Sequence, residues 1–167
     1  MTLLDIILLI ILFIFFASGL WFGLIHTLGA LLGLVGGIFA ARFFYNDLAP
    51  VITPYCLGNT FLAQIASFII IFILLKFLIS IIFDIINKFF NILAIIPFLK
   101  TINRLAGGIF NLLEGALICG IILFLASRFP IIPLVEKILA ESQVAQILIK
   151  IGGILAPLLP EAFKLLK

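Results

Sequence analysis

Long runs of apolar residues, broken at few points, dominate the chain and predict helices that cross a lipid bilayer. A spanning helix needs about 20 mostly apolar residues. The first run, from Leu3 to Tyr45, is roughly twice as long as the bilayer requires, so the chain must fold back within it. Segment 18–27 holds two glycines, which loosen a helix, together with a tryptophan and a histidine, which suit the headgroup level. We therefore predict a first span near 3–22 and a second near 26–45.

Two polar segments separate the remaining spans. Segment 46–60 is rich in aspartate, proline, glycine and asparagine, which favour turns, and we expect it to be a loop. The apolar run that follows predicts a third span near 61–83. A second loop is expected over 91–104, and a fourth span near 105–127 is stopped by Arg128 and two prolines.

The last part of the chain has a different pattern. Polar residues recur there at helical spacing among apolar ones, which is typical of an amphipathic helix lying at the membrane interface. These polar residues are Glu136, Lys137, Glu141, Ser142, Gln143, Gln146 and Lys150. A fifth span through 144–159 is the alternative, but it would bury a lysine and a proline. We thus predict a transmembrane domain over 1–128 and an amphipathic tail over 129–167.

Composition excludes several classes of protein. Hydrophobic residues make up 66% of the 167 residues and charged residues 10%, with a mean hydropathy of +1.50. A soluble domain is about half apolar and about a quarter charged. The chain is therefore not a soluble monomer or a nucleic-acid-binding domain, and its two cysteines are too few for a disulfide framework. The fold class expected is all-α, a polytopic integral membrane protein with four transmembrane helices and an interfacial tail, and its solvent is the lipid bilayer.

Small residues form a stripe along the second span. They lie four residues apart, at Gly29, Gly33, Gly37 and Ala41, and so share one helix face. Gly19 and Gly23 repeat the spacing at the first turn. Such a face lets a second backbone approach closely. The partner is either another helix of the same chain or a second copy in a homo-oligomer, and the sequence leaves both open.

Charged residues inside the third and fourth spans form the most informative polar set. A charge near the centre of a bilayer is costly and is usually paired in the bundle interior. Lys76 and Glu114 lie at similar depths, so we predict an intramembrane pair, with Asn111 on the same face of the fourth span as Glu114. The pair either neutralises itself structurally or belongs to a proton or ion relay.

Enzymatic chemistry finds little support in the residues. His26 is the only histidine, and no phosphate-binding glycine loop, Cys-x-x-Cys motif or acidic cluster for magnesium occurs. We therefore expect a protein that is not an enzyme and that carries no cofactor and no metal.

Three short motifs resemble a known family. Asp5 stands at the start of the first span, Gly19 and Gly23 flank a glycine-rich turn, and Asn103-Arg104-Leu105-Ala106-Gly107 opens the fourth span, with Gly115 eight residues later. The sequence resembles the colicin V production protein (CvpA) family. The resemblance departs at His26-Thr27, where the family tends to have a basic–acidic pair, and at Asn111 and Glu114, where it often has glycine and a basic residue.

This resemblance implies a multi-pass protein of the bacterial inner membrane, without enzymatic activity, that supports toxin production or export and envelope homeostasis. Envelope or export proteins are the partners it implies. Lysines and arginines do not decide orientation, because both sides carry three. Family members fused to proteases outside the cytoplasmic membrane imply that the tail faces outward. Two alternatives stay open: a small oligomeric channel or transporter that uses Lys76 and Glu114, and a scaffold that docks partners through its tail.

Overall fold

The structure is a computed structural model that describes residues 2–93, 97–128 and 133–158. Its long helices are α1 (Leu3–Phe22), α2 (Leu24–Ile52), α3 (Thr60–Leu93) and α4 (Pro97–Arg128). Its short ones are α5 (Pro133–Glu141), α6 (Gln143–Gly153) and the single-turn 3-10 helices η1 (Thr53–Cys56) and η2 (Ala156–Leu158). The four long helices are apolar and long enough to cross a membrane. The protein is therefore all-helical, with four candidate membrane spans followed by short C-terminal helices, as predicted.

The first span begins where the sequence predicts and is fixed there by a capping box. Thr2 Oγ1 accepts a hydrogen bond from Asp5 N at 3.2 Å, and Asp5 Oδ2 accepts one from Thr2 N at 2.7 Å. These two bonds satisfy backbone donors that the first turn of a helix leaves without partners. The helix ends at Gly23, whose φ of 83° lies in the left-handed region that glycine adopts easily.

The two loops are shorter than predicted. The second helix continues through Pro50 to Ile52, so most of the loop expected over 46–60 is helical. Proline inside a helix loses one backbone hydrogen bond and crowds the carbonyl four residues before it, and this helix ends two residues after Pro50. The loop expected over 91–104 is also largely helical, because α3 runs to Leu93 and α4 starts at Pro97. Proline suits the first position of a helix, where its N–H would have no partner.

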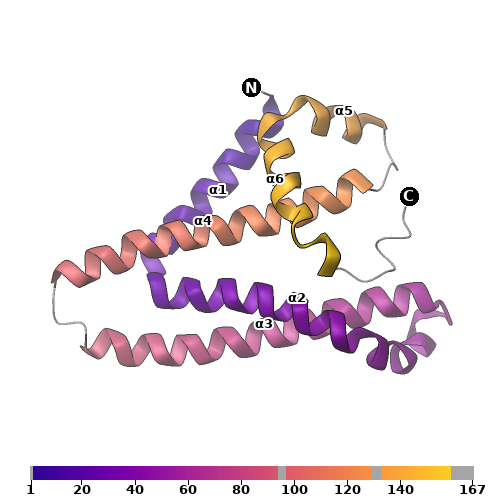
Figure 1. Cartoon of the computed structure of the whole chain (residues 1–167), viewed down its shortest axis with the longest axis horizontal. Coiled ribbons are helices and arrows are strands. Elements are labelled where there is room, and N and C mark those ends of the chain that lie inside the picture. Colours follow the sequence, from indigo (N-terminus) through magenta and orange to yellow (C-terminus); the bar gives the residue numbers. More distant parts are fainter. Residues whose placement is uncertain (1, 94–96, 129–132, 159–167) are drawn as a thin grey trace.

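The helices pack as a hairpin of α2 and α3 beside a crossed pair of α1 and α4. Figure 1 shows α2 and α3 running antiparallel along the long axis, with α1 and α6 crossing α4 at steep angles. One apolar cluster joins α2, α3, α4 and the segment after α6, and centres on Leu34, Ile38, Phe68 and Leu155. A second joins α1, α4, α5 and α6 around Leu8, Cys119 and Leu148.

The small-residue stripe of α2 faces α3 of the same chain. A Cβ atom added at Gly29 would collide with the side chain of Phe83, and one added at Gly33 would lie 3.1 Å from the carbonyl oxygen of Lys76. Gly37 lies against Phe72 in the same way, and Ala41 is fully buried. The stripe therefore serves close packing within the chain, which is the first of the two interpretations of its spacing.

The C-terminal helices are amphipathic, and α6 packs directly on α4. A Cβ atom on either Gly120 of α4 or Gly152 of α6 would collide with the backbone of the other helix. Since α6 has 11 residues, it is about half as long as a helix that spans the bilayer, so the fifth-span alternative is wrong. The last part of the predicted amphipathic tail, residues 159–167, lies outside the described residues.

Candidate functional site

A lysine near the middle of α3 meets a glutamate of α4. Lys76 Nζ lies 3.1 Å from Glu114 Oε1, and the two side chains are 31% and 5% exposed. The structure thus places together the two residues that the sequence predicts to pair. Helix α3 packs mainly on α2, whereas α4 packs on α1, α2 and α6. The ion pair therefore connects α3 and α4, two helices that make few other contacts with each other. Opposite charges at this depth neutralise each other where water is scarce.

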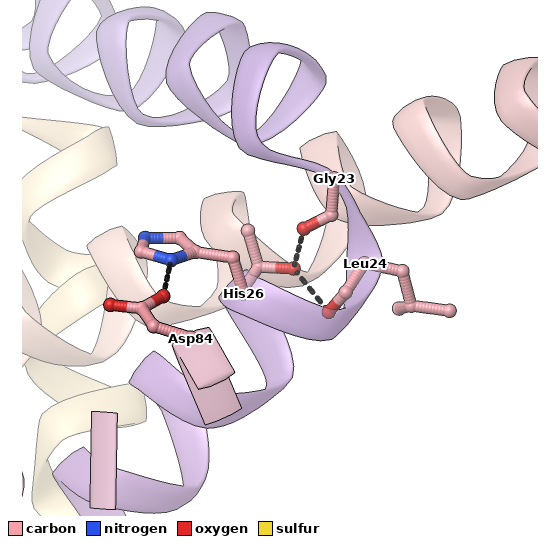
Figure 2. Close-up of polar contacts among 5 residues, drawn as sticks. Gly23, Leu24, His26 and Asp84 are labelled. Carbon is pink, nitrogen blue, oxygen red and sulfur yellow. Dashed lines mark hydrogen bonds and ion pairs between the residues drawn. The ribbon is translucent and has the colours of Figure 1, made fainter. Parts of the chain in front are cut away.

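A second ion pair lies two turns further along α3. His26 Nδ1 is 2.5 Å from Asp84 Oδ1, and Figure 2 shows the imidazole pointing at the carboxylate. The imidazole N–H donates to the carboxylate oxygen in this arrangement. Phe22 stacks on the His26 ring with centroids 4.6 Å apart, and the pair is partly exposed. The sequence pattern did not predict this contact between His26 and Asp84.

The turn between α1 and α2 positions His26. Thr27, the next residue, donates its hydroxyl to the carbonyl oxygens of Gly23 and Leu24. Asn103 of α4 closes the same turn, since its Oδ1 accepts a hydrogen bond from Leu24 N at 3.2 Å. A Cβ atom on Gly23 would lie 2.5 Å from Asn103 Nδ2, so glycine is required there both for its backbone angle and for the close approach of Asn103.

The other family-motif positions form the crossing of α1 and α4. Gly19 and Gly107 face each other so closely that a Cβ atom on either would collide with the carbonyl oxygen of the other. Gly115 makes room for the ring of Phe15 in the same interface. Arg104 is exposed and lies beside Trp21 in a shallow surface pocket. Of the four motif positions in α4, Gly107 and Gly115 thus allow close packing on α1, and Asn103 bonds the turn between α1 and α2.

Asn111 has a different partner from the one the sequence suggests. Its Nδ2 donates to the carbonyl oxygen of Phe15 at 2.5 Å and to Ser18 Oγ at 2.6 Å, both on α1. The interpretation that it belongs with Lys76 and Glu114 is therefore wrong, although it lies one turn from Glu114. Asn111 joins α4 to α1 instead, because the glycines at 19 and 107 bring α1 within reach of its short side chain.

A third polar contact joins the start of α1 to the start of α6. Asp5 is buried, 2% exposed, and its Oδ1 accepts hydrogen bonds from Ser142 Oγ at 2.5 Å and from Val144 N at 3.0 Å. Ser142 also caps α6 by accepting from Ala145 N. A carboxylate at a helix N-terminus is favoured by the unpaired N–H groups there. Sequence reasoning noted both residues separately and missed this contact.

The polar contacts described above are ion pairs and hydrogen bonds that join one helix to another. In the part of the chain that the structure describes, no three His, Cys, Asp or Glu residues gather to hold a metal ion. The hydroxyl of Ser18 donates to Phe15 and accepts from Asn111. The arrangement can keep opposite charges paired inside a membrane bundle.

Comparison with known proteins gives one family and one relative. The model of the family described as "Colicin V production protein" matches residues 4–153. The chain is 30% identical over 174 residues to a protein of Bacillus subtilis (strain 168) described as "Uncharacterized transmembrane protein YshB", covering 95% of this chain and 96% of that protein. No solved structure matches.

Proposed function

The chain belongs to the colicin V production protein family, and from this premise we propose that it is a non-enzymatic protein of the bacterial inner membrane that supports toxin production or export and envelope homeostasis. The observation that carries the proposal is the extent of the family match. Residues 4–153 cover the four long helices except Leu3, together with α6, and hence the ion pairs of Lys76 and His26 and the bonds of Asn103, of Asn111 and of Asp5 with Ser142.

That the protein is not an enzyme is part of the proposal. The support for it is that the polar side chains inside the bundle bond other helices. Asp5, Asn103 and Asn111 each bond backbone or hydroxyl groups that hold helices together. Lys76 and His26 each pair with an acid. Groups committed in this way stabilise an arrangement of helices, which is what a protein acting through its membrane domain requires.

Complementation tests this function. A colicin V-producing strain that lacks its own family member should secrete several-fold less toxin and be more sensitive to detergent, and this chain should restore both. The variant Gly107→Leu should fail, because the α1–α4 crossing has no room for a side chain. Ile14→Ala, on the exposed side of α1, is the matched control and should restore both phenotypes. If the wild-type chain reaches the membrane and restores neither, the proposed function is wrong.

The second candidate is a small channel or transporter, and the two ion pairs favour it. Lys76 and Asp84 lie eight residues apart on α3, about 12 Å along the helix, and each has a partner on another helix. Purified protein in liposomes should then carry protons or cations faster than protein-free liposomes, as measured with an internal pH dye and with ion-sensitive dyes. Flux equal to that of protein-free liposomes for protons, sodium and potassium would exclude this candidate and leave the first unaffected.

A further inference from the structure

An apolar groove lies between α3 and α4 on a floor formed by α2. Its volume is about 450 Å³, within the range of about 300–1,000 Å³ that small-molecule sites occupy. Its walls include Ile65, Ile69 and Phe72 of α3 and Ile121 and Leu125 of α4, and Lys76 lies at one end. All the other residues that line it are isoleucine, leucine or phenylalanine, so Lys76 brings the single charge to an apolar surface.

The Lys76 ammonium group has hydrogen-bonding capacity to spare at the groove. An ammonium group has three donors and no acceptor. Among the described residues its hydrogen-bond acceptor is Glu114 Oε1, and its side chain is 31% exposed. Since the walls beside it are hydrocarbon, a ligand in the groove that carries an oxygen acceptor would meet a donor that the protein itself leaves available.

The hydrophobic effect cannot select a ligand for this groove. A chain that moves from lipid into an apolar groove leaves one hydrocarbon environment for another and gains little. Selectivity must therefore come from the polar end, where a hydrogen bond to a charged group is among the stronger single contacts.

The depth of Lys76 in the membrane limits which ligand headgroups can reach it. The lysine lies near the middle of a 34-residue helix, and the twelve residues from Ile65 to Lys76 cover about 16 Å, close to the thickness of one leaflet. A phosphate head keeps its charge at neutral pH and stays at the membrane surface. A carboxyl group can bind one proton, lose its charge and reach the interior.

We propose that this groove binds a single-chain carboxylic acid, of the long-chain fatty-acid class, with the chain lying along α3 and the carboxyl oxygen accepting a hydrogen bond from Lys76. The groove has room for one chain, and Lys76 supplies the donor for its head. This binding site is independent of the toxin-related function, so either can fail without the other.

Photolabelling tests the site in the full chain reconstituted in phosphatidylcholine nanodiscs. The probe is a sixteen-carbon fatty acid with a diazirine on its chain. Labelling should saturate, fall several-fold with excess palmitic acid, and map to peptides that contain residues 65–76 and 118–125. Methyl palmitate, which has the same chain but no ionisable head, should compete about tenfold less well, since it lacks the charge-assisted contact.

Variants separate the groove from general association with the protein. Ile69→Trp narrows the groove from a position that is 45% exposed, and should cut labelling several-fold. Ile14→Trp makes the same change on the exposed side of α1 and should not. The double variant Lys76→Met with Glu114→Gln keeps the site neutral and should remove the preference for acid over ester.

Three results would overturn the proposal. The first is labelling that does not saturate or that Ile69→Trp leaves unchanged. The second is an equal effect of palmitic acid and methyl palmitate on the wild-type chain. The third is that Ile69→Trp divides an oligomer, seen by native mass spectrometry, because the groove would then hold a second copy of the chain.

Discussion

Asp5 accepts a hydrogen bond from Ser142, 137 residues later in the chain, at an Oγ–Oδ1 distance of 2.5 Å. The carboxylate also bonds Thr2 N at the start of α1 and Val144 N at the start of α6. One buried acid thus satisfies the first turns of two helices. It fixes α6 against the bundle at one end, while Gly120 and Gly152 hold it against α4 at the other.

Replacing this acid should release α6 from the bundle. In Asp5→Ala the donors of Ser142 and of two backbone N–H groups lose their acceptor, and buried donors without partners destabilise a fold. We expect thermal unfolding several degrees lower and faster proteolysis between α5 and α6. Asp47→Ala removes an exposed acid of α2 and is the control. Equal melting temperatures for the two variants would contradict the structural role of Asp5.

The turn between α1 and α2 should depend on an acceptor oxygen at position 103. Asn103→Ala removes the acceptor for Leu24 N and should lower the free energy of unfolding by about 1 kcal/mol. Asn103→Asp keeps an oxygen there that can accept from Leu24 N, and should retain most of the stability. Denaturation in mild detergent measures the free energy of unfolding of both variants. An aspartate variant that is as unstable as the alanine variant would contradict the role of the acceptor oxygen.

Bulk on the α2 stripe should destabilise the α2–α3 hairpin. A methyl group at Gly29 has no room beside Phe83, and overpacking typically costs about 1–3 kcal/mol. We expect Gly29→Ala and Gly33→Leu to lower the thermal stability of the protein. Gly36→Ala is the matched control, since its new methyl group would meet only the end of the Ile79 side chain at 3.3 Å. The same melting temperature for Gly29→Ala and Gly36→Ala would show that the stripe is not the tight interface described here.

The sequence predicts the helices of this protein better than the contacts between them. Four apolar runs locate the spans, because lipid allows few alternatives to a helix of about 20 apolar residues. Similar depth was enough to pair Lys76 with Glu114. The partners of His26 and Asp5 lie 58 and 137 residues away, and no periodicity along one helix shows which residue of another helix faces it.

The register of the hairpin was the missing information. Gly29 lies opposite Phe83, Gly33 opposite Lys76 and Gly37 opposite Phe72, as expected for antiparallel helices. The same antiparallel register brings the start of α2 beside Asp84. If one contact between α2 and α3 had been known, the spacing of the glycines would therefore have indicated Asp84 as the partner of His26. Helix ends were predicted poorly for another reason, since α2 and α4 continue into polar segments that composition alone assigns to loops.

The chain should lie in the membrane with its C-terminus outside the cytoplasm. Asp5 of α1 and Ser142, which caps α6, are in contact and so lie on one side of the membrane, and the family members fused to proteases outside the cytoplasmic membrane imply that this side faces outward. Alkaline phosphatase fused after Lys167 should therefore be active, because it folds outside the cytoplasm. A green fluorescent protein fusion at the same site is the counterpart and should be dark. Bright fluorescence with an inactive phosphatase would reverse the orientation.

Lys76 and Glu114 should be energetically coupled. Removing either leaves the other charge unpaired in a poorly solvated interior, which costs several kcal/mol in soluble proteins and less in a membrane, where water can follow a charged side chain. We expect Lys76→Met and Glu114→Gln each to lower stability by about 1–3 kcal/mol. The double variant should recover part of the loss, since it leaves neither charge alone. Strictly additive losses in the double-mutant cycle would mean that the two residues do not interact.

The same variants distinguish a structural pair from one that moves charge. A structural pair only has to be neutral, so the double variant should regain both stability and the ability to complement toxin secretion. A pair that relays protons or ions needs groups that gain and lose charge, which methionine and glutamine cannot supply. Recovery of stability without recovery of complementation would therefore indicate a relay, and liposome flux that the double variant abolishes would identify the ion. Ile14→Ala, which changes an exposed position of α1, should alter none of these three measurements.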